Sequence, residues 1–244
     1  MQKRAQVTTF ILLGIIIAIV LFIVFYFLGE RLLAQTQNKT PFDKSQLIPL
    51  QKQIESCIQL SLDKSVINLR RNAFFLEESP YTLEYGGAKI SYLIYPEDSP
   101  NKLLSIEGVQ DEISNQIVSD LVKCSLDKFN NLNIKKNDKE IKAETTIAEN
   151  KVLIALTYPM EVSRSGTTLQ LKDFSYSKET DLGAIYNTIN DIISGELQGE
   201  FDTVSYFNEK RNVVINKNNL DDKNIIYLVS SPQEKEYVMF AIKR

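Results

Sequence analysis

An uninterrupted apolar stretch from Phe10 to Leu28 constrains this chain more than any other feature. The stretch holds nineteen residues and no charge. An α-helix rises about 1.5 Å per residue, so the stretch would reach roughly 28 Å, the thickness of the hydrocarbon core of a bilayer. The sequence therefore predicts a transmembrane helix over residues 10–28, in contact with lipid.

Positive charge ahead of this stretch sets the expected orientation. Residues 1–9 are short and basic, with Lys3 and Arg4, so the positive-inside rule keeps them in the cytoplasm. A polar stalk, residues 29–41, and the rest of the chain would then lie outside. A secretory signal peptide is the alternative, but its apolar region is usually 7–15 residues long and ends at small residues. Bulky residues close this stretch, so we expect an uncleaved, single-pass anchor in the cell membrane and an extracellular C-terminal domain.

The two cysteines agree with an outside location. Cys57 and Cys124 both follow the apolar stretch, and an even number of cysteines outside the cytosol favours a disulfide. Two free thiols buried as small apolar groups are the alternative. A bond between them would close a long loop, and chain-entropy estimates then give a stabilisation of roughly 4 kcal/mol as an upper figure.

Charge limits the classes of partner. Without Lys3 and Arg4, the chain has 26 basic and 31 acidic residues, so its net charge is negative. Nucleic acid is therefore not an expected ligand. We expect an extracellular protein partner or self-association instead. Asn38 begins an Asn-Lys-Thr sequon and is a candidate N-glycosylation site, with an unmodified linker as the alternative.

Apolar periodicity predicts an α+β domain with about three amphipathic helices, over residues 47–71, 110–129 and 181–197. The first two helices carry Cys57 and Cys124 on their apolar faces, so packing them together would bring the sulfur atoms close. We divide the outer part into a helix-hairpin-helix lobe, residues 42–130, and a β-rich lobe with one helix, residues 131–244. Thr180 is the candidate N-cap of the third helix.

A glycine pair, Gly86-Gly87, predicts a tight hairpin turn. The turn fixes a register that pairs Tyr85 with Ala88 and, two steps on, Leu83 with Ile90. One face of the hairpin then carries tyrosines and aliphatic residues. We expect that face to pack on the two helices, with a binding surface as the alternative.

Alternating apolar residues predict an antiparallel meander in the second lobe. Its strands would be residues 141–147, 152–162 and 169–176, with turns at Asn150 and at residues 164–166. Three further strands are expected at residues 212–216, 225–230 and 236–243.

Residues that support common enzyme mechanisms are missing from the composition. The chain has no histidine, which removes the usual general base and imidazole metal ligands. We expect no catalytic residues, no cofactor and no metal. Three groups of residues are weaker candidates for chemistry: the oxygen-rich segment 216–224 as a calcium loop, Glu77-Glu78 as paired carboxylates, and segment 163–166 in a Ser-Lys hydrolase. A solvated turn, an extended segment and a β-turn explain them without chemistry.

The N-terminus, Lys3-Arg4-Ala5-Gln6-Val7-Thr8-Thr9-Phe10 with the apolar stretch behind it, resembles archaeal type IV pilin-like precursors. The resemblance implies cleavage by a prepilin peptidase between Ala5 and Gln6. The family often carries an acidic residue at the fifth mature position, where this chain has Phe10. The wider layout resembles membrane-anchored surface proteins of archaea of the DPANN group, which implies a location and no activity.

These observations lead to three functional hypotheses. The first is a non-enzymatic cell-surface protein with an envelope or attachment role. The second is a pilin-like filament subunit, and the third is a membrane-anchored Ser-Lys hydrolase.

Overall fold

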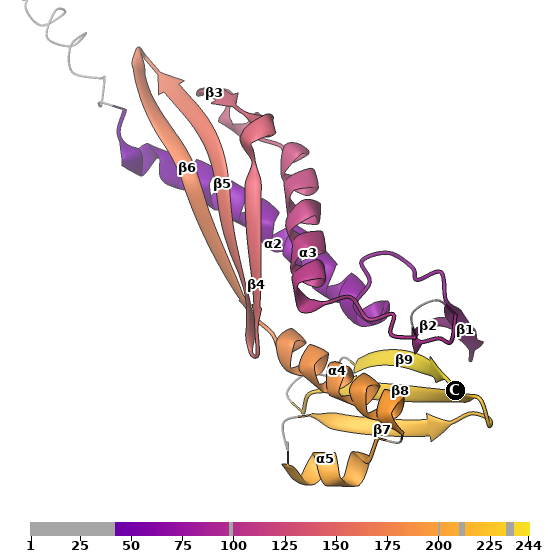
Figure 1. Cartoon of the computed structure of the whole chain (residues 1–244). Helices are drawn as coiled ribbons and strands as arrows, with labels where there is room; N and C mark the ends of the chain where they lie inside the picture. Colours follow the sequence, from indigo (N-terminus) through magenta and orange to yellow (C-terminus); the bar gives the residue numbers. More distant parts are fainter. Residues whose placement is uncertain (1–41, 98–99, 200, 210–212, 233–236) are drawn as a thin grey trace, which may run out of the picture. The chain divides into compact units, whose positions relative to one another are not determined.

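The computed structural model describes residues 42–97, 100–199, 201–209, 213–232 and 237–244. Lys44–Arg244 form one compact unit of α+β architecture, shown in Figure 1. The predicted membrane helix, the stalk, Asn38 and the Ala5-Gln6 bond lie outside the described residues. No helix among those the structure describes is both long and apolar enough to cross a bilayer.

The first long helix confirms its prediction almost to the residue. A short 3-10 turn, Lys44–Leu47, leads into α2, Ile48–Arg71, with a proline in its first turn. Ile54, Ile58 and Leu62 recur at spacings of four on its apolar face and are fully buried. Figure 1 shows α2 running beside the long strand β6.

The second helix begins and ends earlier than predicted. Helix α3 spans Ile106–Val122, because Ser105 caps it by accepting a hydrogen bond from the amide of Gly108. The chain leaves the helix at Lys123, so Cys124 lies just beyond α3 and not on its apolar face. A 3-10 turn, Asp127–Phe129, follows instead of the expected helical turn.

The predicted meander is confirmed and gains a strand. Strands β4, Lys142–Ala148, and β6, Thr167–Glu179, flank the long strand β5, Lys151–Arg164. The unpredicted strand β3, Asn133–Lys136, pairs with the far half of β5, and a 3-10 turn, Asp138–Glu140, links β3 to β4. Helix α3 packs on β4 and α2 on β6.

The hairpin and the last strands form a second, five-stranded sheet. Its order is β1-β2-β9-β8-β7. The bounds are Thr82–Tyr85 for β1, Ala88–Ile94 for β2, Val214–Asn219 for β7, Asn224–Ser230 for β8 and Tyr237–Lys243 for β9. The predicted hairpin register is confirmed, while β2 joins β9 in a parallel pairing that the sequence did not indicate.

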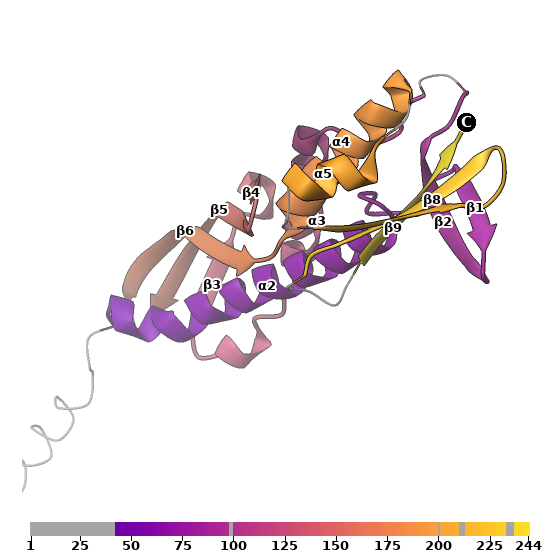
Figure 2. The same ribbon diagram turned by 90° about the horizontal axis from the view of Figure 1, so that it is seen from below.

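The third predicted helix is confirmed as α4, Leu182–Gln198, and a short helix α5, Thr203–Glu209, follows it. The expected N-cap is wrong, since Asp181 occupies that position and makes no capping hydrogen bond. Helix α4 can begin here because Gly183 has no side chain. A Cβ at that position would lie 2.2 Å from the carbonyl oxygen of Ala148. Figure 2 shows α4 and α5 on the same side of β8.

The tyrosine face of the hairpin does not pack on the two helices. Ile90 and Tyr92 instead form a small buried cluster with Ile226 and Ala241 of the neighbouring strands. The opposite face of β2 meets α2, because the Ser91 hydroxyl donates a hydrogen bond to the carbonyl of Asn72 over 3.1 Å. The side of the hairpin that faces the helices was therefore predicted wrongly.

Candidate functional site

A groove of about 1050 Å³ opens where the C-terminal end of α2 meets the beginnings of β2 and β9. Its walls come from four segments that are far apart in the sequence. They are residues 67, 68 and 70–72 at the C-terminal end of α2, residues 76–78, residues 87–90 at the β1-β2 turn and the start of β2, and Tyr237 with Met239 of β9.

The five-stranded sheet is divided at this groove, because β2 and β9 separate from each other over their first halves. Strands β2 and β9 pair only through Tyr92 with Ala241 and Ile94 with Ile242. Ahead of these contacts, the first half of β2 pairs with β1 and the first half of β9 pairs with β8. Within the described part of the chain, the facing edges of these two half-strands have no strand partner. Main-chain amide and carbonyl groups therefore border the opening.

Exposed apolar side chains line the groove. Ile67 of α2 is 56 % exposed and Tyr237 of β9 is 52 % exposed. Ile90 is buried, and Leu76 and Met239 are partly buried beside them. Large apolar groups that remain exposed together on a soluble domain mark contact surfaces more often than scattered single ones do.

Charged residues form the rim of the groove. Lys89 and Glu78 make an exposed ion pair, with 2.7 Å between Nζ and Oε1. The hydrogen bond from Lys89 to Glu78, together with the charge of that carboxylate, raises the pKa of Lys89. Glu78 is thus engaged by a lysine, and the structure does not bring Glu77 and Glu78 together as a catalytic pair. An apolar floor with a polar rim is the usual composition of a protein-protein contact.

A buried ion pair holds α2 against the start of α4 next to the groove. Arg70 lies 2.5 Å from Asp181 and donates a second hydrogen bond to the hydroxyl of Thr180 over 3.1 Å. The Arg70 side chain is only 4 % exposed. The Asp181 carboxylate therefore serves as the partner of Arg70, which explains why it does not cap α4.

A sharp change of direction after α2 carries the chain toward β1. Ala73 and Phe74 have positive φ angles of 52° and 70°, which are uncommon for residues with a side chain. Both residues are fully buried, and the Phe74 ring meets the edge of Tyr186 with 5.2 Å between centroids. Packing therefore fixes the wall that residues 76–78 contribute to the groove.

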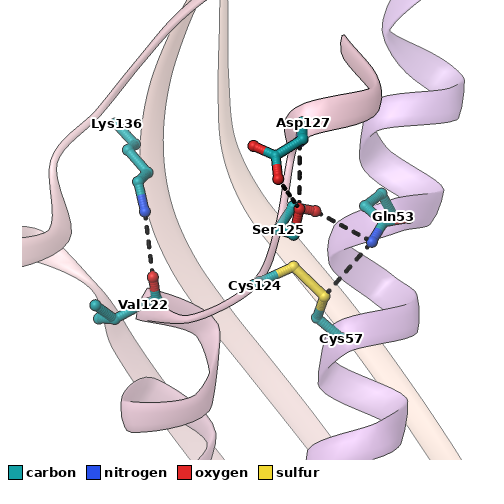
Figure 3. The surroundings of a disulfide bond; sticks show 7 residues. All are labelled: Gln53, Cys57, Val122, Cys124, Ser125, Asp127 and Lys136. Carbon is teal, nitrogen blue, oxygen red and sulfur yellow. Dashed lines mark hydrogen bonds between the residues drawn. A yellow bond between two sulfur atoms is a disulfide. The ribbon is translucent and has the colours of Figure 1, made fainter. Parts of the chain in front are cut away.

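The expected disulfide joins Cys57 of α2 to Cys124 beyond α3, as Figure 3 shows. The two Cα atoms are 6.2 Å apart, and the cysteines lie 67 positions apart in the sequence. The Gln53 amide reaches the Cys57 sulfur over 3.8 Å and the carbonyl of Ser125 over 3.4 Å. These contacts fasten the loop after α3 to the helix.

Two other groups of residues from the sequence appear as turns. Segment 216–224 is the β7-β8 hairpin, and the Asp221 carboxylate accepts hydrogen bonds from the Asn224 side chain and from the amides of Lys223 and Asn224. In the part of the chain that is described, no cluster of three acidic or cysteine side chains could hold a metal ion. Ser163 donates its hydroxyl to the carbonyl of Asn133, next to the β5-β6 turn.

Sequence reasoning missed the groove. One signal was present, because Leu60 and Ile67 lie two turns apart on the exposed side of α2 and are 67 % and 56 % exposed. Strands β2 and β9 pair although almost 150 residues separate them, and no sequence pattern within either strand predicts that pairing.

Comparisons with protein-family models, with curated proteins and with solved structures give no match to this chain.

Proposed function

We propose that this chain is a single-pass cell-surface protein without enzymatic activity, and that its outer domain binds an extended segment of another polypeptide in the groove. The observation that carries the proposal is the divided sheet between β2 and β9. Two half-strands with open edges face the same groove. The amide and carbonyl groups along an open strand edge can form hydrogen bonds with the main chain of an added strand.

The lining of the groove supports an apolar segment as the occupant. A strand added beside β2 or β9 presents alternate side chains to the same side. Ile67 and Leu76 offer apolar surface on the α2 side of the groove, Tyr237 offers it on the other face of β9, which carries Met239 and Ala241, and the Lys89-Glu78 pair stands at the rim. Main-chain hydrogen bonds would supply affinity, and the apolar contacts would select the sequence.

The anchor rests on residues 10–28 and on the basic residues ahead of them. The disulfide agrees with an oxidising location outside the cytosol. A membrane-impermeant amine reagent should label the lysines of the outer domain on intact cells. Labelling that appears only after lysis would contradict the orientation.

A photoreactive residue at Ile67 tests the contact surface in native membranes. We expect a covalent adduct with one protein, and we expect the added substitution Tyr237→Asp to abolish it. The same photoreactive residue at Val204, which is 69 % exposed on α5, is the control for exposure alone. An adduct at twice the mass of the chain would identify a second copy as the occupant.

Two results would overturn the proposed contact surface. One is an equal yield of adducts from Ile67 and Val204. The other is an adduct from Ile67 that persists unchanged with Tyr237→Asp while the domain remains folded.

A further inference from the structure

Two segments at opposite ends of the domain differ in charge. Residues 123–142, which contain the loop after α3 and strand β3, hold six lysines against three acidic residues. Residues 72–112, which contain the β1-β2 hairpin, hold eight acidic residues against two lysines. The two segments thus differ in the sign of their charge, although Arg70 and Arg71 of α2 and Lys243 of β9 adjoin the second segment and offset part of its negative charge.

The basic end is the end at which the chain enters the domain. Strand β3 pairs with the part of β5 next to the β5-β6 turn, and Asn133 faces Ser163. Arg164 at that turn donates a hydrogen bond to Gln46, just ahead of α2, over 3.3 Å. Figures 1 and 2 both show β3, this turn and the start of α2 at the same end.

A depression of about 640 Å³ lies in this basic end, between the loop after α3 and β3. Lys123 and Lys136 line it, together with Asp127, Asn130, Asn133 and the half-buried ring of Phe129, and Nζ of Lys136 lies 3.4 Å from the Asp138 carboxylate. Lys128 and Lys135 are exposed nearby. Ammonium and amide groups around an aromatic ring suit a phosphate-bearing lipid headgroup at a bilayer surface.

The chain between the apolar stretch and the domain is short. Residues 29–43 are fifteen in number and reach about 50 Å at most when fully extended. The β1-β2 hairpin follows the opposite end of α2, whose 24 residues extend about 36 Å. The chain that follows the apolar stretch therefore enters the domain at its basic end.

We propose that this basic end, formed by residues 123–136 and the β5-β6 turn, lies on the anionic headgroups of the membrane that holds the anchor. This inference rests on the membrane anchor of the proposed function. Contact through this end would point the acidic hairpin and the groove away from the bilayer, toward partners.

The absence of tryptophan from the chain gives a clean test. Full-length Phe129→Trp and Tyr85→Trp variants are placed in vesicles with a nitroxide-headgroup lipid, which quenches nearby tryptophan. Vesicles of phosphatidylcholine alone are compared with vesicles that also contain phosphatidylglycerol. We expect several-fold stronger quenching at residue 129 than at residue 85 in the anionic vesicles, and a loss of that difference in 1 M salt, where the Debye length falls to about 3 Å.

Charge reversal separates lipid contact from simple proximity. The double variant Lys128→Glu with Lys135→Glu should remove the quenching at residue 129. The control double variant Lys151→Glu with Lys223→Glu should leave that quenching unchanged. Equal quenching at residue 129 in neutral and anionic vesicles, or no quenching there, overturns the inference. Flotation of the protein with the vesicles reports the anchor separately, so a chain that fails to float contradicts the proposed function itself.

Discussion

Tyr92 and Ala241 are the first residues at which β2 and β9 pair, although almost 150 residues separate them in the sequence. Everything before them in both strands stands open on one side, and the groove lies there. Ser91, next to Tyr92, is tied to the end of α2 by its hydroxyl, so the helix and the divided sheet are held in one arrangement.

The disulfide should supply a large share of the stability of the domain. Replacing Cys57 and Cys124 with serine should lower the free energy of unfolding by about 2–5 kcal/mol. Chemical denaturation with and without a reductant measures this effect. The reductant should destabilise the natural chain and leave the double variant unchanged, and equal unfolding midpoints for the two proteins would refute the prediction.

The buried pair of Arg70 and Asp181 should show strong coupling. Arg70→Met leaves a carboxylate in a mostly buried site, which should cost about 3–5 kcal/mol. The double variant Arg70→Met with Asp181→Leu should recover much of that loss, because no charge remains uncompensated. A double-mutant cycle measures the coupling, and purely additive losses would show that the pair does not act as a unit.

Gly183 should tolerate no side chain. Gly183→Ala places a Cβ against the Ala148 carbonyl and should cost about 1–3 kcal/mol. Gly108→Ala in α3 is the matched control, since its Cβ would meet Ser105 at an ordinary 3.5 Å. That control should be neutral or gain up to about 1 kcal/mol from helix propensity. Similar thermal midpoints for the two variants would contradict the close approach of α4 to the β4-β5 turn.

Glu196 should make the domain sensitive to acid. Burial alone would raise the pKa of its carboxyl, but hydrogen bonds from Lys217 and Tyr227 outweigh burial and hold the pKa below the ordinary 4.5. A lowered folded-state pKa gives a stabilisation that is present above the unfolded-state pKa and is lost as the pH falls through the folded-state pKa.

Unfolding measured from pH 7 to pH 2 checks this behaviour. With Glu196→Gln, the free energy of unfolding should decrease less steeply below pH 4.5 than it does in the natural chain. Glu84→Gln, at an exposed position, should leave that decrease unchanged. A parallel fall in the natural chain and in Glu196→Gln would show that other groups control the acid response.

Local sequence patterns predicted much of the fold, but they did not predict the pairing of strands that are far apart in the sequence. The glycine pair at residues 86–87 determined the hairpin register, and the spacing of apolar residues located α2 and α4. Strand β3 was missed because its residues, Asn133–Lys136, are mostly polar and gain their pairing from β5. The groove depends on β2 meeting β9, and no feature within either strand specifies the other.

Hydrogen exchange at the divided strands tests the proposed contact most directly. The amides of residues 88–91 and 237–240 are compared in native membranes and after purification in detergent. We predict that the amides of these residues that face the groove exchange slowly in native membranes and faster once the partner is removed, while residues 225–229 in β8 stay unchanged. Equal exchange of residues 88–91 and 237–240 in both samples would contradict strand addition at the groove.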